Sequence, residues 1–169
     1  MIQYYYGDGK GKTTAAVGSA IRMAGNGGKV LFAQFYKNGD SSEVKILKSL
    51  DNIEYKMSLV KYSLFEDDKG TLDKINQEYL LLIQEIKEEI KSDNISMVVL
   101  DEIQYLYETT IDKEDFNKWI KEISTDVEVI LTGHSLSEEL INISDYVSEI
   151  KKIKHPFDKG IDARKGIEY

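Results

Sequence analysis

The sequence predicts an α/β fold in which a mostly parallel central sheet carries helices on both faces. Short apolar segments typical of buried strands alternate along the chain with segments of helical periodicity. A glycine-rich loop at residues 7–12 joins the first such strand to the first helix. Buried parallel strands are apolar on both sides, so they need a layer of helices on each face.

The first half of the chain contains three expected strands and three expected helices. The helix that begins at residue 12 ends at the glycines of "GNGG". The segment 71–92 has the strongest helical signal, because apolar side chains recur there at steps of three and four residues. These side chains are Leu72, Ile75, Tyr79, Ile83, Ile86 and Ile90. We expect strands at residues 2–6, 30–36 and 53–57, helices at residues 12–24, 43–50 and 71–92, and an irregular connection at residues 58–70.

The second half continues the alternation. The apolar stretch "SMVVL" predicts a buried strand that ends at Asp101. We expect strands at residues 96–100, 127–132 and 146–150, and helices at residues 116–123 and 138–143. Ligands of parallel sheets bind at the carboxyl ends of the strands. The loops at residues 7–12, 101–102 and 132–135 are therefore expected to share one edge of the sheet.

Length and composition indicate one domain spanning residues 1–169. Hydrophobic residues make up 41% of the chain and charged residues 31%, a mix typical of globular proteins. The absence of cysteine excludes disulfides and thiolate metal sites. No apolar run approaches the ~20 residues that cross a bilayer, and a strand begins where a signal peptide would lie. We therefore expect a cytoplasmic protein with no membrane partner.

The charge of the chain is unevenly distributed. A net charge of −8 argues against nucleic acid as a partner, since duplex binding needs a positive surface. Residues 151–169 hold six basic and three acidic side chains, a net charge of +3, which leaves −11 on residues 1–150. This basic tail is either a solvated surface or a contact for an anion, for example the phosphates of a nucleotide.

The stretch "GDGKGKTT" at residues 7–14 resembles the Walker A pattern G-x-x-x-x-G-K-[ST], with Tyr6 in place of the first glycine. The glycines allow backbone N–H groups to turn toward an anion, and the following helix adds its positive end. Lys12 supplies a charge for the phosphates, Lys10 a second one, and the Thr13 hydroxyl is the expected Mg²⁺ ligand. The loop predicts nucleoside triphosphate binding and a P-loop NTPase-like fold. The expected binding residues are Gly7, Asp8, Gly9, Lys10, Gly11, Lys12, Thr13 and Thr14.

The stretch "MVVLDE" resembles a Walker B motif, a buried strand that ends in carboxylates. Asp101 and Glu102 are both candidate ligands of Mg²⁺, directly or through water. Alternatively, Glu102 serves as a base toward an attacking water, which would make the protein an ATPase.

The C-terminal residues carry a more specific pattern. The ending "KHPFDKGIDARKGIE" is similar to K-H-x-[FY]-D-x-G-[IV]-x-A-[RQ]-x-G-I-[ED], the ending of the ATP:corrinoid adenosyltransferase family. The matching residues are Lys154, His155, Phe157, Asp158, Gly160, Ala163, Gly166 and Ile167. The phosphate loop, the stretch "VLFAQFYKNG" followed by Glu43, and "VVLDEI" also resemble that family, so the resemblance runs nearly end to end.

The resemblance implies a reaction that breaks the C5′–O bond of ATP. A cobalt(I) corrinoid attacks the 5′ carbon and the whole triphosphate leaves, so the protein supplies no nucleophile. The resemblance places Lys12, Glu102 and Phe65 in the catalytic set, with ATP, Mg²⁺ and the corrinoid as ligands. It further implies a homodimer and a flavoprotein reductant. Tyr62 and Phe65 are expected either to displace the lower ligand of the corrinoid or to pack under a loop.

The chain departs from the family at Thr132-Gly133-His134, where the family has T-G-R. A titratable His134 at a phosphate contact implies weaker ATP binding at alkaline pH. Many members of the family also have an N-terminal extension that folds over the corrinoid, whereas this sequence starts directly at its first expected strand. Two other functions compete: a P-loop ATPase or nucleotide kinase, and a non-catalytic nucleotide-sensing module. Neither explains the C-terminal pattern.

Overall fold

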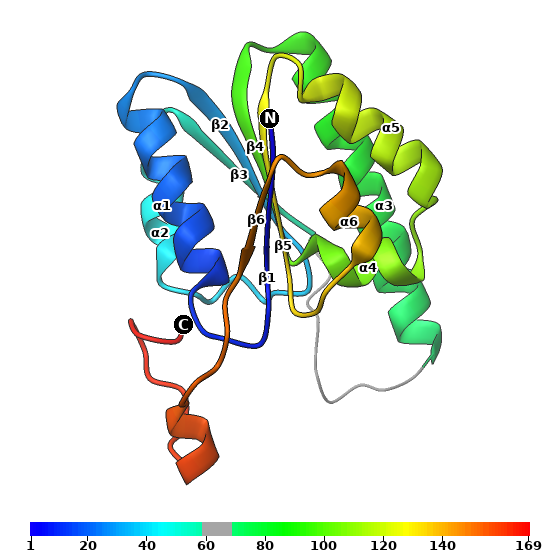
Figure 1. Ribbon diagram of the computed structural model, residues 1–169. Helices are drawn as coiled ribbons and strands as arrows, with labels where there is room; N and C mark the ends of the chain where they lie inside the picture. The colour runs from blue at the N-terminus through cyan, green and yellow to red at the C-terminus, as the bar shows by residue number, and fades with distance from the viewer. Residues whose placement is uncertain (59–68) are drawn as a thin grey trace.

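A computed structural model describes residues 1–58 and 69–169 of the chain. Its strands form one six-stranded sheet in the order β3-β2-β4-β5-β1-β6, and every pair of neighbours is parallel (Figure 1). The strands are β1 (Ile2–Tyr6), β2 (Lys29–Gln34), β3 (Ile53–Met57), β4 (Ile95–Asp101), β5 (Glu128–Gly133) and β6 (Tyr146–Glu149). The helices are α1 (Lys12–Gly25), α2 (Glu43–Leu47), α3 (Lys69–Ser92), α4 (Ile103–Thr109), α5 (Lys113–Ile123) and α6 (Glu138–Ile143), with a 3₁₀ turn η1 (Pro156–Lys159).

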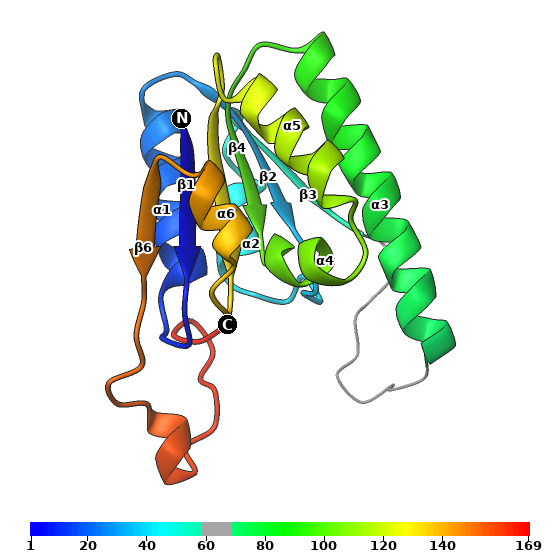
Figure 2. The same ribbon diagram turned by 45° about the vertical axis from the view of Figure 1, so that its right-hand side comes forward.

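Helices cover both faces of the sheet, as the sequence predicts. Helices α1 and α2 lie on one face, and α3, α4, α5 and α6 lie on the other (Figures 1 and 2). Successive residues of β2 pack into different layers, because side chains of a strand alternate between its faces. Val30 and Phe32 join a cluster with Ala16 and Ala20 of α1, whereas Leu31 joins the larger cluster with α3 and α5. The α/β fold class is thus confirmed.

The expected elements are present with small shifts at their ends. Strand β2 ends at Gln34, two residues before the expected boundary, because Tyr36 has a positive φ of 50° that ends the extended chain. Helix α2 ends at Leu47 rather than at residue 50. Helix α4 was not expected, since seven residues of mixed aromatic and apolar character carry little periodicity. The expected contacts of Tyr62 and Phe65 with the corrinoid lie outside the described residues.

The parallel arrangement of the strands determines where the candidate site lies. Because all strands are parallel, the loops that follow β1, β2, β4 and β5 leave from the same edge of the sheet. After β6 the chain passes this edge, forms η1 and returns toward α1 and α2 (Figures 1 and 2). Within residues 1–58 and 69–169 there is no helix of the length and apolar character that crossing a membrane requires.

Candidate active site

The phosphate loop joins β1 to α1 and ends at Gly11, which caps the helix with a φ of +124° that favours glycine. Lys12 begins the helix and is only 6% exposed. Its Nζ donates a hydrogen bond to the Gly9 carbonyl at 3.0 Å. Burial lowers the pKa of Lys12, because the surroundings penalise its charged form. The loop therefore holds a nearly buried cation that donates a hydrogen bond to a neutral carbonyl.

The outer half of the phosphate loop packs against the chain that follows β6. Gly9 N donates to the Ile150 carbonyl at 2.8 Å, and a Cβ on Gly9 would lie 2.6 Å from that oxygen. A Cβ on Gly7 would lie even closer, at 2.4 Å. These two glycines are thus required by a neighbouring backbone, a reason that the loop sequence alone does not reveal.

Asp8, expected among the ATP-binding residues, points toward the basic tail in this structure. Its Oδ1 accepts a hydrogen bond from Lys152 N at 2.9 Å. This bond lowers the pKa of Asp8, so the carboxylate stays ionised. Asp8 therefore anchors the start of the tail to the phosphate loop.

Asp101 lies at the centre of the site and is fully buried. Its carboxylate accepts hydrogen bonds from Thr13 Oγ1 at 3.1 Å, Thr132 Oγ1 at 2.7 Å and Gln34 Nε2 at 3.0 Å. Burial, and then the charge of Glu102, raise the pKa of Asp101. Three elements that are distant in sequence thus meet at one carboxylate. Of its partners, Gln34 was missed, although a glutamine that ends the apolar stretch of β2 was a signal.

Glu102 faces another way than Asp101. It adopts a left-handed conformation with φ 61°, and its N–H donates to Thr132 Oγ1 at 2.8 Å. Its carboxylate lies 3.6 Å from Lys37 Nζ and 4.0 Å from His134 Nε2. These three side chains line a pocket of about 220 Å³ together with Tyr36 and Tyr105. Lys37 and the two tyrosines were not expected from the sequence.

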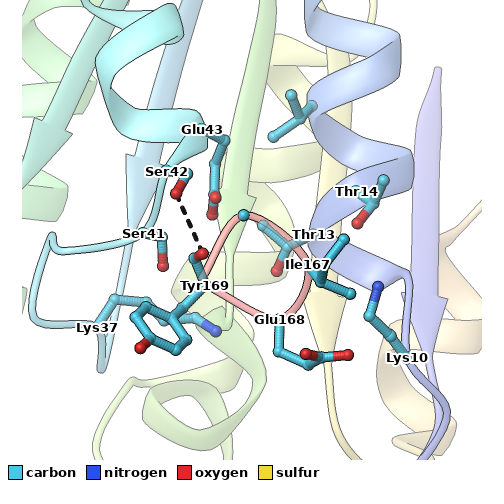
Figure 3. A pocket seen from close by; sticks show the side chains of 12 residues that line it. Lys10, Thr13, Thr14, Lys37, Ser41, Ser42, Glu43, Ile167, Glu168 and Tyr169 are labelled. Atoms are coloured by element: carbon cyan, nitrogen blue, oxygen red, sulfur yellow. Dashed lines mark hydrogen bonds between the residues drawn. The ribbon is translucent and has the colours of Figure 1, made fainter. Parts of the chain in front are cut away.

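A larger pocket of about 420 Å³ lies beside Thr13 (Figure 3). Its walls come from three parts of the chain: the phosphate loop with α1, the β2–α2 connection, and the end of the tail. The lining includes Lys10 and Thr14 from the first part and Ser42 from the second. Ser42 Oγ donates to the backbone oxygen of Tyr169 at 3.1 Å, a bond drawn in Figure 3. The tail is therefore a wall of the pocket next to the phosphate loop.

The end of the tail is held by an internal ion pair. Arg164 donates to the Glu168 carboxylate from its backbone N at 2.8 Å, its Nε at 3.2 Å and its Nη2 at 3.0 Å. These bonds lower the pKa of Glu168 to about 2. The bonds to Arg164 hold Glu168 in place, and Glu168 and Ile167 line the pocket beside Thr13.

The side-chain oxygen atoms of Asp101 and Thr13 are suitable ligands for a hard cation such as Mg²⁺. The Thr13 hydroxyl and the Asp101 carboxylate adjoin at 3.1 Å, and Mg²⁺ prefers such oxygen ligands. In the part of the chain that the structure describes, no group of three or more His, Cys, Asp or Glu side chains could hold a metal ion. Mg²⁺ typically takes one or two carboxylates and completes its shell with phosphates and water.

Comparison with solved structures shows the same fold in two other proteins. The flagellar accessory protein FlaH of Methanocaldococcus jannaschii superposes with a TM-score of 0.55 at 17% identity, over 88% of this chain and 69% of that one. The cytoplasmic domain of EssC gives a TM-score of 0.54 at 17% identity, over 97% of this chain and 33% of that one. The P-loop NTPase-like fold expected from the sequence is confirmed.

Sequence comparison is more specific. A corrinoid adenosyltransferase of Escherichia coli (strain K12) is 29% identical over 170 residues, which cover 100% of this chain and 85% of the relative. The corrinoid adenosyltransferase CobA of Salmonella typhimurium is 30% identical over 172 residues, with the same coverage of both chains. The family model described as ATP:corrinoid adenosyltransferase BtuR/CobO/CobP matches residues 1–169. This chain therefore belongs to the ATP:corrinoid adenosyltransferase family.

Proposed function

We propose that this transferase binds Mg²⁺-ATP at the phosphate loop and Asp101, and passes the 5′-deoxyadenosyl group to a reduced corrinoid. One observation carries the proposal. The tail, whose ending is similar to the family's, forms a wall of the pocket beside Thr13. Family membership favours corrinoid adenosylation over the alternative of a P-loop ATPase or nucleotide kinase.

In this reaction the main role of the protein is to stabilise the leaving triphosphate. An electron pair of cobalt(I) forms the bond to C5′, and the C5′–O electron pair departs with the triphosphate. The protein's task is to stabilise that growing charge, which preorganised N–H groups and cations do well. We assign this role to the loop N–H groups from Lys10 to Thr13 and to the Lys12 amine.

The two acidic residues after β4 are proposed to have separate roles. Asp101 and Thr13 would hold Mg²⁺, because their oxygens adjoin. Bound there, Mg²⁺ would neutralise charge on the phosphates. Glu102 would instead position Lys37 and His134 at the smaller pocket, as the distances of 3.6 Å and 4.0 Å support.

Several further assignments rest on the family resemblance. We propose a homodimer, a flavoprotein electron donor and a cytoplasmic location. The absence of cysteine in the 169 residues suits a reducing compartment.

The decisive experiment uses an ATP analogue with a methylene group in place of the β–γ bridging oxygen. Adenosyl transfer leaves that bond intact, whereas a kinase or ATPase must break it. We expect the analogue to yield an adenosylated corrinoid and the methylene triphosphate, more slowly than ATP because the leaving-group charge is altered. The corrinoid is reduced chemically beforehand, and the product is followed by its absorbance spectrum.

The contrary result is equally clear. If the analogue binds competitively without yielding an adenosylcorrinoid, while ATP itself yields ADP and phosphate, the phosphate loop serves phosphoryl chemistry. ATP with no corrinoid present is the control, and it should stay intact.

A second prediction concerns His134. Its side chain is 72% exposed and lies within 4.0 Å of Glu102 at the smaller pocket. His134→Arg puts a permanent cation at this position, as in the family's T-G-R. We expect this variant to lower the ATP dissociation constant about two- to fivefold, the effect of one exposed charge. An unchanged dissociation constant in His134→Arg would contradict the prediction.

A further inference from the structure

A second large pocket lies on the other side of Lys10, under the basic tail. It has a volume of about 500 Å³ and lies between the phosphate loop and residues 151–168. Five basic side chains line it, namely Lys10, Lys151, Lys152, Lys154 and Arg164, against the single carboxylate of Glu168. A local excess of positive charge in this acidic chain thus lies next to its phosphate loop.

Three of these cations have carboxylate partners. Lys151 pairs with Glu149, Lys152 with Asp158 and Arg164 with Glu168, each at 3.0 Å. Lys10 and Lys154 differ, because neither has an ion-pair partner within 4.0 Å among residues 1–58 and 69–169. Two unpaired cations that line the same pocket are available to an anionic ligand.

The pocket under the basic tail, called the tail pocket below, is adjacent to the pocket beside Thr13. Lys10, Ile167 and Glu168 line both of them. A second positive surface therefore lies next to the phosphate loop, on the other side of Lys10. The acidic remainder of the chain repels anions, which makes such a local positive surface more selective.

We propose that the tail pocket binds phosphate groups of a polyphosphate anion, and that its ligand is the triphosphate released by the reaction. The inference rests on the proposed function, whose leaving group it follows outward from the loop. Lysines act on phosphate as point charges, and the Arg164 fork can exchange the Glu168 carboxylate for phosphate oxygens. A corrinoid that carries a phosphodiester presents the same chemistry, so the test must separate the two sources.

The test measures binding of inorganic triphosphate by calorimetry, with Mg²⁺ and without corrinoid. Lys154→Glu is the main variant, because the Lys154 side chain is exposed and unpaired, so its replacement does not disturb the fold. We expect its dissociation constant for triphosphate to rise about five- to tenfold, and Lys154→Arg to bind as the wild type does. The difference should shrink at about 1 M salt, where exposed charges are screened.

Lys118→Glu is the matched control. It makes the same charge reversal at an exposed pocket beside Trp119, far from the phosphate loop. Equal weakening in Lys118→Glu and Lys154→Glu would reduce the effect to net charge and overturn the proposal. Unchanged binding in Lys154→Glu would also overturn it.

A second experiment distinguishes a corrinoid phosphodiester from triphosphate as the ligand of the tail pocket. Adenosylation of a phosphodiester-bearing corrinoid is compared with that of one without the phosphodiester, in the wild type and in Lys154→Glu. A loss confined to the first corrinoid, with triphosphate binding intact, would refute the triphosphate assignment. Failure of the wild type to form any adenosylcorrinoid would instead refute the proposed function and leave the calorimetric result standing.

Discussion

Replacing Lys12 with alanine should lower the rate of adenosyl transfer by about 10²- to 10³-fold, the usual cost of removing one group that stabilises developing charge. Lys12 is the cation built into the phosphate loop, and its Nζ donates to a carbonyl of the loop itself at 3.0 Å. We expect the amine to exchange this carbonyl for a phosphate oxygen when ATP binds. The measurement is the rate of adenosylcorrinoid formation with chemically reduced corrinoid and saturating ATP.

The same variant should remain folded. Because burial lowers the pKa of Lys12, its charged form costs folding free energy at neutral pH, and removing the charge relieves that cost. Lys12→Met, which keeps an unbranched side chain of similar length, is expected to unfold at the wild-type temperature or above. Full activity in a folded Lys12→Met would show that the loop acts without this amine. Thr13→Ala is expected to lose activity in the same way, through its metal contact.

The second large effect is expected at Asp101. Asp101→Asn should raise the Mg²⁺ concentration needed for half-maximal activity by about tenfold or more, and lower the maximal rate by about 10²-fold. The reason is that it removes the buried carboxylate to which Thr13 Oγ1 donates. Burial raises the pKa of Asp101, so its ionised form opposes folding above the pKa of the unfolded chain. The asparagine variant should therefore melt at the wild-type temperature or above, which separates lost chemistry from lost structure.

Glu102→Gln is the matched control for Asp101→Asn. Glu102 faces Lys37 and His134, so its amide variant should keep the wild-type Mg²⁺ requirement while changing activity. If the Mg²⁺ requirement rises in Glu102→Gln and not in Asp101→Asn, the two roles proposed here are reversed. An unchanged requirement in both variants would refute the assignment of the metal site to this strand end.

Much of the candidate site could be predicted because its parts are local in sequence. The phosphate loop is one continuous stretch between a strand and a helix, and Asp101 ends an apolar strand. A parallel sheet brings the ends of its strands to one edge, so three separate loops could be placed together in advance. The bonds from Thr13 and Thr132 to Asp101 confirm that placement.

Other residues of the site could not be found in this way, because their positions depend on contacts between distant segments. Gln34 reaches Asp101 only because β2 and β4 are neighbours in the sheet. Glu102 turns away from Asp101 because its backbone is left-handed, and no sequence pattern announces this conformation. Helix α4 is too short for its periodicity to be recognised, yet it supplies Tyr105 to the smaller pocket.

By itself the sequence determined the fold class, the phosphate loop and the family resemblance, because each can be recognised from short continuous stretches of residues. Only the tertiary structure decided what Gly7, Gly9 and Asp8 contact, because the chain that packs against them lies more than 140 residues away. It also placed the basic tail beside the phosphate loop. The tail lines the two pockets on either side of Lys10, because strand β6 pairs with β1 and so delivers the tail to the loop that β1 begins.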